Sequence, residues 1–161
     1  MDHSLKNNTP KITQVGIVVR DGVKIENSMR TLFGMEPYRI KETCDDDARR
    51  YYGKQGDFHA HLIYYMFGDI EVEFIVPVSG KSIWQDYLDT HGEGLHHIQF
   101  AVDDCDEIAR DFSNYGIEII QEGSSVSKIP GAKWQYYDLA PVLPFILESF
   151  DGKAKAEKLK N

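Results

Sequence analysis

Cysteine is scarce in this chain of 161 residues, since only Cys44 and Cys105 occur and they form no metal-binding or redox spacing motif. Two idle, reduced thiols favour a cytoplasmic protein. The sequence also has no apolar run near the roughly 18–20 residues that span a bilayer, and its N-terminus has no basic-then-apolar secretory signal. We therefore expect neither a membrane protein nor a disulfide-stabilised secreted one.

Positive charge is also in short supply. Lysine and arginine number 18 against 26 aspartates and glutamates, which gives a formal net charge of −8. Such a balance argues against a protein that grips nucleic-acid phosphates. With 42% hydrophobic and 27% charged residues, the chain has the composition of an ordinary globular protein, either one domain or two small fused units.

The sequence contains a weak internal repeat. QVGIVVRD at 14–21 aligns with HIQFAVDD at 97–104, an offset of 83, and each segment is followed by a helical stretch that ends near a glycine. IEVEFIV at 70–76 aligns with FILESF at 145–150, which places Glu73 opposite Glu148 at an offset of 75. The two offsets differ, which implies a change in loop length between the halves, and surface loops tolerate such a change. We therefore expect a duplicated structure.

Periodicity and capping signals divide the chain into alternating elements. Strands are predicted over 12–19, 47–53, 58–67, 70–77, 96–102, 117–121, 133–138 and 144–150. Helices are predicted over 24–33, over 82–91 after the capping box of Ser82 and Gln85, and over 107–115 after Asp104. These elements predict an α+β fold of two βαβββ modules, 11–80 and 93–151, joined by the linker helix 82–91. Residues 1–10 are expected to form a loose arm, and residues 152–161 a polar tail.

Four strands carry a polar side chain capable of binding a metal on the face opposite their apolar residues. Because side chains alternate along a strand, Gln14, Glu73, His97 and Glu148 fall at matching positions of the two repeats. One amide, one imidazole and two carboxylates, without a thiolate, suit a divalent ion such as Ni, Co, Zn, Mn or Mg. Such an ion polarises a carbonyl, and a neighbouring carboxylate moves the proton.

GEGLHHIQFAVDD at 92–104 resembles a motif of the vicinal oxygen chelate superfamily, which includes glyoxalases, bleomycin resistance proteins and extradiol dioxygenases. The likeness extends over about 11–151 and is closest to methylmalonyl-CoA epimerase and glyoxalase I. It implies two βαβββ modules forming a cupped mixed sheet around a metal, with His97, Glu73, Glu148 and Gln14 at the ligand positions. It also implies a homodimer.

The resemblance implies an isomerase or lyase that shuttles a proton next to a metal-bound carbonyl, most closely an epimerase of acyl-CoA thioesters. The set Gln14, Glu73, His97 and Glu148 resembles one type of glyoxalase I, a lyase acting on a glutathione adduct, so this alternative stays open. A non-catalytic small-molecule binding or resistance protein of the same fold is a second alternative. An extradiol dioxygenase is disfavoured because its iron requires two histidines and one carboxylate.

Each candidate residue has an expected role. Glu148 is the first choice for the proton shuttle and Glu73 the second, while His97 is the principal metal ligand. Gln99 shares the face of His97 and is expected to contact substrate or support a ligand. His59 and His61 alternate on one strand and are weaker candidates for the pocket wall. His96 is expected on the opposite face of its strand, in a structural role.

Overall fold

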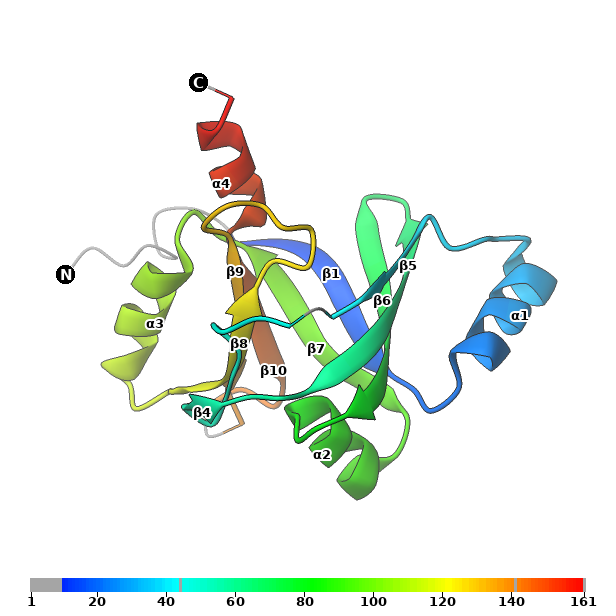
Figure 1. The fold of residues 1–161 in the computed structure, drawn as a ribbon, viewed down its shortest axis with the longest axis horizontal. Helices are drawn as coiled ribbons and strands as arrows, with labels where there is room; N and C mark the ends of the chain where they lie inside the picture. Colours follow the sequence, from blue (N-terminus) through cyan, green and yellow to red (C-terminus); the bar gives the residue numbers. More distant parts are fainter. Residues whose placement is uncertain (1–9, 44, 141, 161) are drawn as a thin grey trace.

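The computed structural model describes residues 10–43, 45–140 and 142–160, so Cys44 and nearly all of the expected N-terminal arm lie outside the described residues. The described chain forms one ten-stranded sheet in the order β2-β5-β6-β1-β7-β10-β9-β8-β3-β4. The sheet curls, with β5 and β6 on one side of the central strands β1 and β7, and β9 and β10 on the other (Figure 1). This curled mixed sheet confirms the predicted α+β class.

The strands have the bounds β1 Lys11–Val18, β2 Arg39–Glu42, β3 Arg50–Tyr51, β4 Lys54–Gln55, β5 His59–Phe67, β6 Ile70–Ser79, β7 Gly94–Ala101, β8 Ile119–Ser124, β9 Lys133–Asp138 and β10 Ile146–Phe150. The helices are α1 Gly22–Phe33, α2 Ile83–His91, α3 Cys105–Ser113 and α4 Gly152–Lys158.

Strand pairing repeats between the two halves. In the first half β1 runs parallel to β6, and β6 pairs antiparallel with β5. In the second half β7 runs parallel to β10, and β10 pairs antiparallel with β9. Antiparallel pairing of β1 with β7 joins the halves at the centre of the sheet. The first strand of each repeat therefore lies at this junction, where the strongest sequence match was found.

The structure differs from the strand prediction at the edges of the sheet. β2 was not predicted, because RIKE lacks the clear alternation of a half-buried strand. The strand predicted over 47–53 is the short hairpin β3–β4, which pairs with β8 of the second half. Edge strands bury little surface, so their sequences carry a weak hydrophobic signal.

Helix boundaries follow the capping residues. Ser82 accepts a hydrogen bond from the backbone N–H of Gln85 at 3.1 Å, and α2 ends at Gly92, as predicted. Asp104 accepts hydrogen bonds from the N–H groups of Asp106 and Glu107 at the start of α3. These caps satisfy N–H groups that would otherwise lack partners in the first turn.

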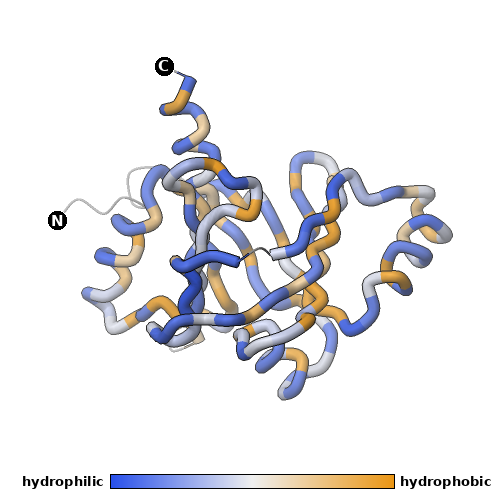
Figure 2. The backbone as a smooth tube through the Cα atoms, in the orientation of Figure 1, coloured by the Kyte–Doolittle hydropathy of each residue, from blue (hydrophilic) through white to orange (hydrophobic). Residues whose placement is uncertain are grey.

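The outer face of the sheet packs against helices. Beneath α1, Met29 contacts Ile63 and Tyr65 of β5, and beneath α3, Ile108 packs with Tyr137 and Leu147. Hydrophobic and hydrophilic segments alternate along both helices (Figure 2), as expected for helices with one buried stripe. Covering the outer face by helices leaves the inner face of the central strands to form a separate environment.

The segment expected as a polar tail begins with α4, which projects beyond the sheet (Figure 1). Asp151, just before it, is fully buried and accepts hydrogen bonds from the N–H groups of Cys105 and Lys133. These contacts connect the base of α4 to the second module. Among the described residues, no helix has the length and apolarity to span a bilayer.

Candidate metal centre

The four central strands bring together the four predicted ligands. Gln14 lies on β1, Glu73 on β6, His97 on β7 and Glu148 on β10, and each is no more than 6% exposed. These strands are consecutive in the sheet, in the order β6-β1-β7-β10. Because all four side chains project from the inner face, residues far apart in sequence converge.

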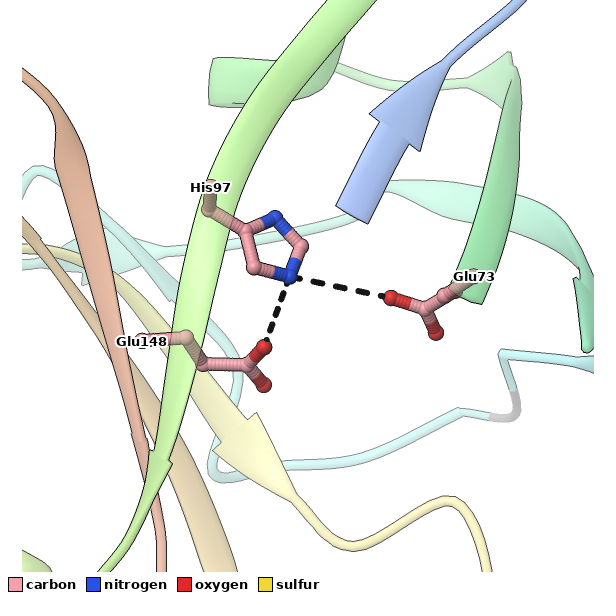
Figure 3. A group of neighbouring side chains, drawn as sticks. All are labelled: Glu73, His97 and Glu148. Carbon is pink, nitrogen blue, oxygen red and sulfur yellow. Dashed lines mark ion pairs between the residues drawn. The ribbon is translucent and has the colours of Figure 1, made fainter. Parts of the chain in front are cut away.

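Both carboxylates face the same nitrogen of the His97 ring, Glu148 from β10 and Glu73 from β6 (Figure 3). Its Nε2 lies 2.9 Å from Oε2 of Glu148 and 3.9 Å from Oε2 of Glu73. One donor atom from each of the three residues lies within 4.8 Å of the other two. This is the spacing of side chains that can share one cation.

Gln14 presents its carbonyl oxygen to the same point. Its Oε1 lies 3.3 Å from Nε2 of His97 and accepts a hydrogen bond from Gln99 at 3.2 Å. Its amide nitrogen donates to Oε1 of Glu71 at 2.6 Å. Glu71 and Gln99 therefore orient the amide with its metal-binding atom facing the site.

Gly16 provides the space for the imidazole. It is paired with both Glu73 and His97 across the neighbouring strands. A Cβ atom at this position would lie 1.9 Å from Cε1 of His97, well inside van der Waals contact. The absence of a side chain at Gly16 is therefore a requirement of the site.

Burial shifts both carboxyl groups toward the neutral form. It raises the pKa of Glu148 to about 8, against the lowering effect of hydrogen bonds from Gln99 and Tyr136. Burial also raises the pKa of Glu73 to about 8, with repulsion from Glu148 adding to the increase and the Tyr64 hydroxyl opposing it. Without a cation, the buried site therefore disfavours the charged form of both carboxyl groups.

Burial has the opposite effect on the imidazole and lowers the pKa of His97 to about 3. The ring is therefore neutral near pH 7 and has a nitrogen lone pair available for a metal. His96 lies against it and was expected on the opposite face of β7, but the two Nδ1 atoms are 3.0 Å apart.

The donor set fits a divalent ion. Glu148 Oε2 is buried and receives no hydrogen bond of normal geometry from the described residues, although it faces His97 Nε2. A cation at this point would satisfy that oxygen and neutralise the repulsion between the carboxylates. Nitrogen and oxygen donors without thiolate suit Ni, Co, Zn or Mn.

A cavity of about 300 Å³ opens beside Gln14, Glu73 and Glu148. Its walls include Trp84 and Tyr136, and Lys153 of α4 lies at its border. The volume suits the reacting part of a small substrate.

The structure does not place His59 and His61 at this cavity. Leu62 and Tyr64 of β5 face it, so the odd-numbered residues of that strand face the other way. His61 instead contacts Glu42, and His59 lies 3.6 Å from Asp45. Gln99, by contrast, lines the cavity and hydrogen-bonds Gln14, as its position on the face of His97 predicted.

Sequence reasoning missed several supporting residues. Glu71 shares the face of Glu73, and strict alternation could have identified it as a neighbour. Tyr64 and Tyr136 lie directly across from Glu73 and Glu148 in the antiparallel pairs, which only the strand register reveals. Arg39 forms an ion pair with Glu71 at 3.0 Å, but it lies on β2, the strand that was not predicted.

The chain matches a known family model over residues 13–136, described as the glyoxalase/bleomycin resistance protein/dioxygenase superfamily. The protein is a member of this superfamily. A comparison with curated proteins finds no match.

Solved structures share the superfamily fold. A hypothetical protein from Bacillus halodurans C-125 has a TM-score of 0.66 at 16% identity, covering 89% of this chain and 94% of its own. A variant methylmalonyl-CoA epimerase from Streptomyces coelicolor, in complex with 2-nitronate-propionyl-CoA, has a TM-score of 0.63 at 17% identity, covering 87% and 92%. The epimerase from Mycobacterium tuberculosis has a TM-score of 0.62 at 16% identity, covering 86% and 85%.

Proposed function

We propose that this superfamily member is a divalent-metal-dependent enzyme that moves a proton next to a substrate carbonyl, most closely a methylmalonyl-CoA epimerase-like isomerase. The observation that carries the proposal is the pair of buried carboxylates that face one imidazole nitrogen, beside a cavity. Gln14, Glu73, His97 and Glu148 would hold the ion. When bound, the ion would polarise the carbonyl and so acidify the adjacent C–H.

Glu148 is assigned as the first proton shuttle and Glu73 as its counterpart. In an epimerisation, the carboxylate of one removes the α-proton, and the carboxyl group of the other returns a proton to the opposite face of the carbon. Burial raises the pKa of each carboxyl to about 8 in the metal-free protein, and a bound ion would lower both values again, which would leave ionised carboxylates able to accept a proton near neutral pH. The two carboxylates reach the same His97 nitrogen from different strands, β10 and β6 (Figure 3), and would therefore approach a substrate carbon beside the ion from two directions.

Substrate class is drawn from the structural neighbours. Solved neighbours include a methylmalonyl-CoA epimerase in complex with methylmalonyl-CoA, with a TM-score of 0.64 at 17% identity. An acyl-CoA thioester is therefore the first substrate to test.

A glyoxalase I-like lyase is the second candidate. It is favoured by the donor set itself, in which Gln14 and Glu73 of the first module meet His97 and Glu148 of the second. In that reaction one carboxylate would move a proton between adjacent carbons of a glutathione hemithioacetal.

A deuterium-exchange assay tests the proposal. The metal-loaded protein is incubated in D2O with an acyl-CoA panel that includes methylmalonyl-CoA, and separately with the hemithioacetal of glutathione and methylglyoxal. We expect deuterium at the α-carbon of an acyl-CoA, and a loss of at least about 100-fold in the rate with Glu148→Gln. Exchange only in the hemithioacetal would support the second candidate. Metal binding without exchange in any substrate would contradict both enzymatic proposals.

His97→Ala tests the metal ligands independently of substrate. We expect the parent protein, purified without chelator, to contain one divalent ion per chain and the variant to lose it, because the imidazole is the central donor. Metal analysis measures the content and circular dichroism checks the fold. A folded variant with unchanged metal content would refute the assignment, and a parent without metal would favour a small-molecule binding protein.

A further inference from the structure

His96 and His97 are neighbours in sequence, and in a regular strand their side chains would point to opposite faces. Their Nδ1 atoms nevertheless lie 3.0 Å apart, within hydrogen-bonding distance. The ring planes are almost perpendicular at 87°, with centroids 5.3 Å apart. The geometry requires a local departure from regular strand structure.

A β-bulge accounts for the departure. In the pairing of β1 with β7, Gly16 faces His97 and the next residue, Ile17, faces Leu95, so His96 is the extra residue of β7. Bulges re-aim side chains and are frequent beside functional sites. Here the bulge sets His96 beside the ligand that stands at the centre of the proposed metal site.

The hydrogen bond between the rings determines where their protons lie. A metal held by His97 Nε2 takes the lone pair of that atom, so the single proton of the neutral ring must sit on Nδ1. That proton points at His96, whose Nδ1 must then accept it. His96 consequently carries its own proton on Nε2.

We propose that His96 is the positioning residue that fixes the tautomer and orientation of His97 and so directs the His97 Nε2 lone pair at the ion. Metal-binding histidines commonly need such a partner for the second ring nitrogen. In this chain the partner is another histidine presented by a bulge. The inference rests on the proposed function only in taking His97 as the metal ligand.

The surroundings of His96 hold it rigidly. It is 4% exposed. Its ring makes T-shaped contacts with the rings of Tyr87 and Tyr136, at centroid distances of 5.2 Å and 5.8 Å. No hydrogen bond of normal geometry reaches His96 Nε2 within the described residues. Burial lowers the pKa of His96, and an interaction with the backbone carbonyl of Ile83 partly opposes this effect. Ile83 and Tyr87 both belong to α2. The linker helix thereby supports the metal ligand through His96.

Nitrogen-15 NMR reads the tautomers directly. Long-range proton–nitrogen correlation spectra of the labelled, Zn²⁺-loaded protein should show His97 protonated at Nδ1 and His96 protonated at Nε2. The reverse assignment for His96, with its proton on Nδ1, would overturn the proposal.

Variants separate the hydrogen bond from packing. His96→Phe keeps a ring but removes the acceptor, whereas His96→Asn places an amide oxygen near the position of Nδ1. We expect the Co²⁺ dissociation constant, measured by chelator competition, to rise about 10-fold to 100-fold for His96→Phe. His96→Asn should stay within about fivefold of the parent, because it keeps an acceptor. His91→Phe is the control, since it makes the same change at an exposed histidine that stacks on Tyr87.

The outcomes distinguish the two proposals. Unchanged Co²⁺ affinity in His96→Phe, or equal losses in His96→Phe and His96→Asn, would overturn the role of His96 while leaving the enzymatic proposal intact. The expected pattern of affinities without deuterium exchange in any substrate would overturn the enzymatic proposal alone. Failure of the parent to bind Co²⁺ would overturn both. If His96→Phe does not fold, His96→Asn and the NMR assignment still decide.

Discussion

Gly16 shows how one residue makes room for the candidate centre. It pairs with His97 across β1 and β7, and its backbone lies against the His97 ring, since an added Cβ would come within 1.9 Å of Cε1. A methyl group here would displace the ring from the point at which it meets Glu73 and Glu148. The consequence can be tested without knowing the substrate.

Gly16→Ala should lower Co²⁺ affinity by at least about 10-fold and reduce the free energy of unfolding by about 1–3 kcal/mol, because an added Cβ overlaps a buried ring. Metal titration and urea denaturation measure the two effects. Gly22→Ala, in the first turn of α1, is the matched control: its Cβ would meet the flexible Cδ1 end of Ile63 at 2.9 Å and Cγ2 of Val76 at 3.3 Å, and no metal-site residue is among its near neighbours. A Gly16→Ala protein with parental metal affinity would contradict the close approach.

At the scale of elements, the duplication extends beyond the ligands themselves. Tyr64 of β5 pairs with Glu73 of β6, and Tyr136 of β9 pairs with Glu148 of β10. In both modules the buried tyrosine hydroxyl lowers the pKa of the facing carboxyl and opposes the effect of burial. Each antiparallel hairpin therefore delivers an acid together with a hydrogen-bond donor that stabilises its charged form.

Tyr64→Phe should weaken Co²⁺ binding about fivefold, because the loss of one hydrogen bond, worth about 1 kcal/mol, disfavours the ionised Glu73. Tyr65→Phe is the control. Its hydroxyl is buried and finds no hydrogen-bond partner in the part of the chain that the structure describes, and its ring packs under α1 on the other face of β5. Chelator competition compares the two, and equal effects of both substitutions would argue against a specific role for Tyr64.

For the whole molecule, the candidate centre links stability to pH. The pKa of Glu73 and of Glu148 is about 8 in the folded, metal-free protein against an ordinary 4.5. Between these values the folded state binds more protons than the unfolded state, so the free energy of unfolding falls as pH rises. Burial of His97 opposes this trend only below its ordinary pKa of 6.5, which leaves a clear window from there to about 8.

In chelator-treated protein, the free energy of unfolding should fall from pH 6.5 to pH 8 by on the order of 1 kcal/mol per pH unit for each carboxyl, and then level off. Urea denaturation across this range measures the slope. Glu148→Gln should reduce it, and a bound divalent ion should abolish it, because a cation favours the ionised carboxylates. A stability that rises over the window would contradict the raised pKa values.

The homodimer stays a prediction, which sedimentation equilibrium tests directly.

The sequence by itself determined the class of the fold and its inner face. Alternation along 14–21, 70–76, 97–104 and 145–150 identified Gln14, Glu73, His97 and Glu148, because a period of two is a local property of strands. Only the tertiary structure decided which other groups join them. Strand register sets Tyr64 opposite Glu73, a bulge turns His96 toward His97, and the parity of β5 turns His59 and His61 away from the cavity. Register and bulges arise from pairing between distant segments, so no local pattern reveals them.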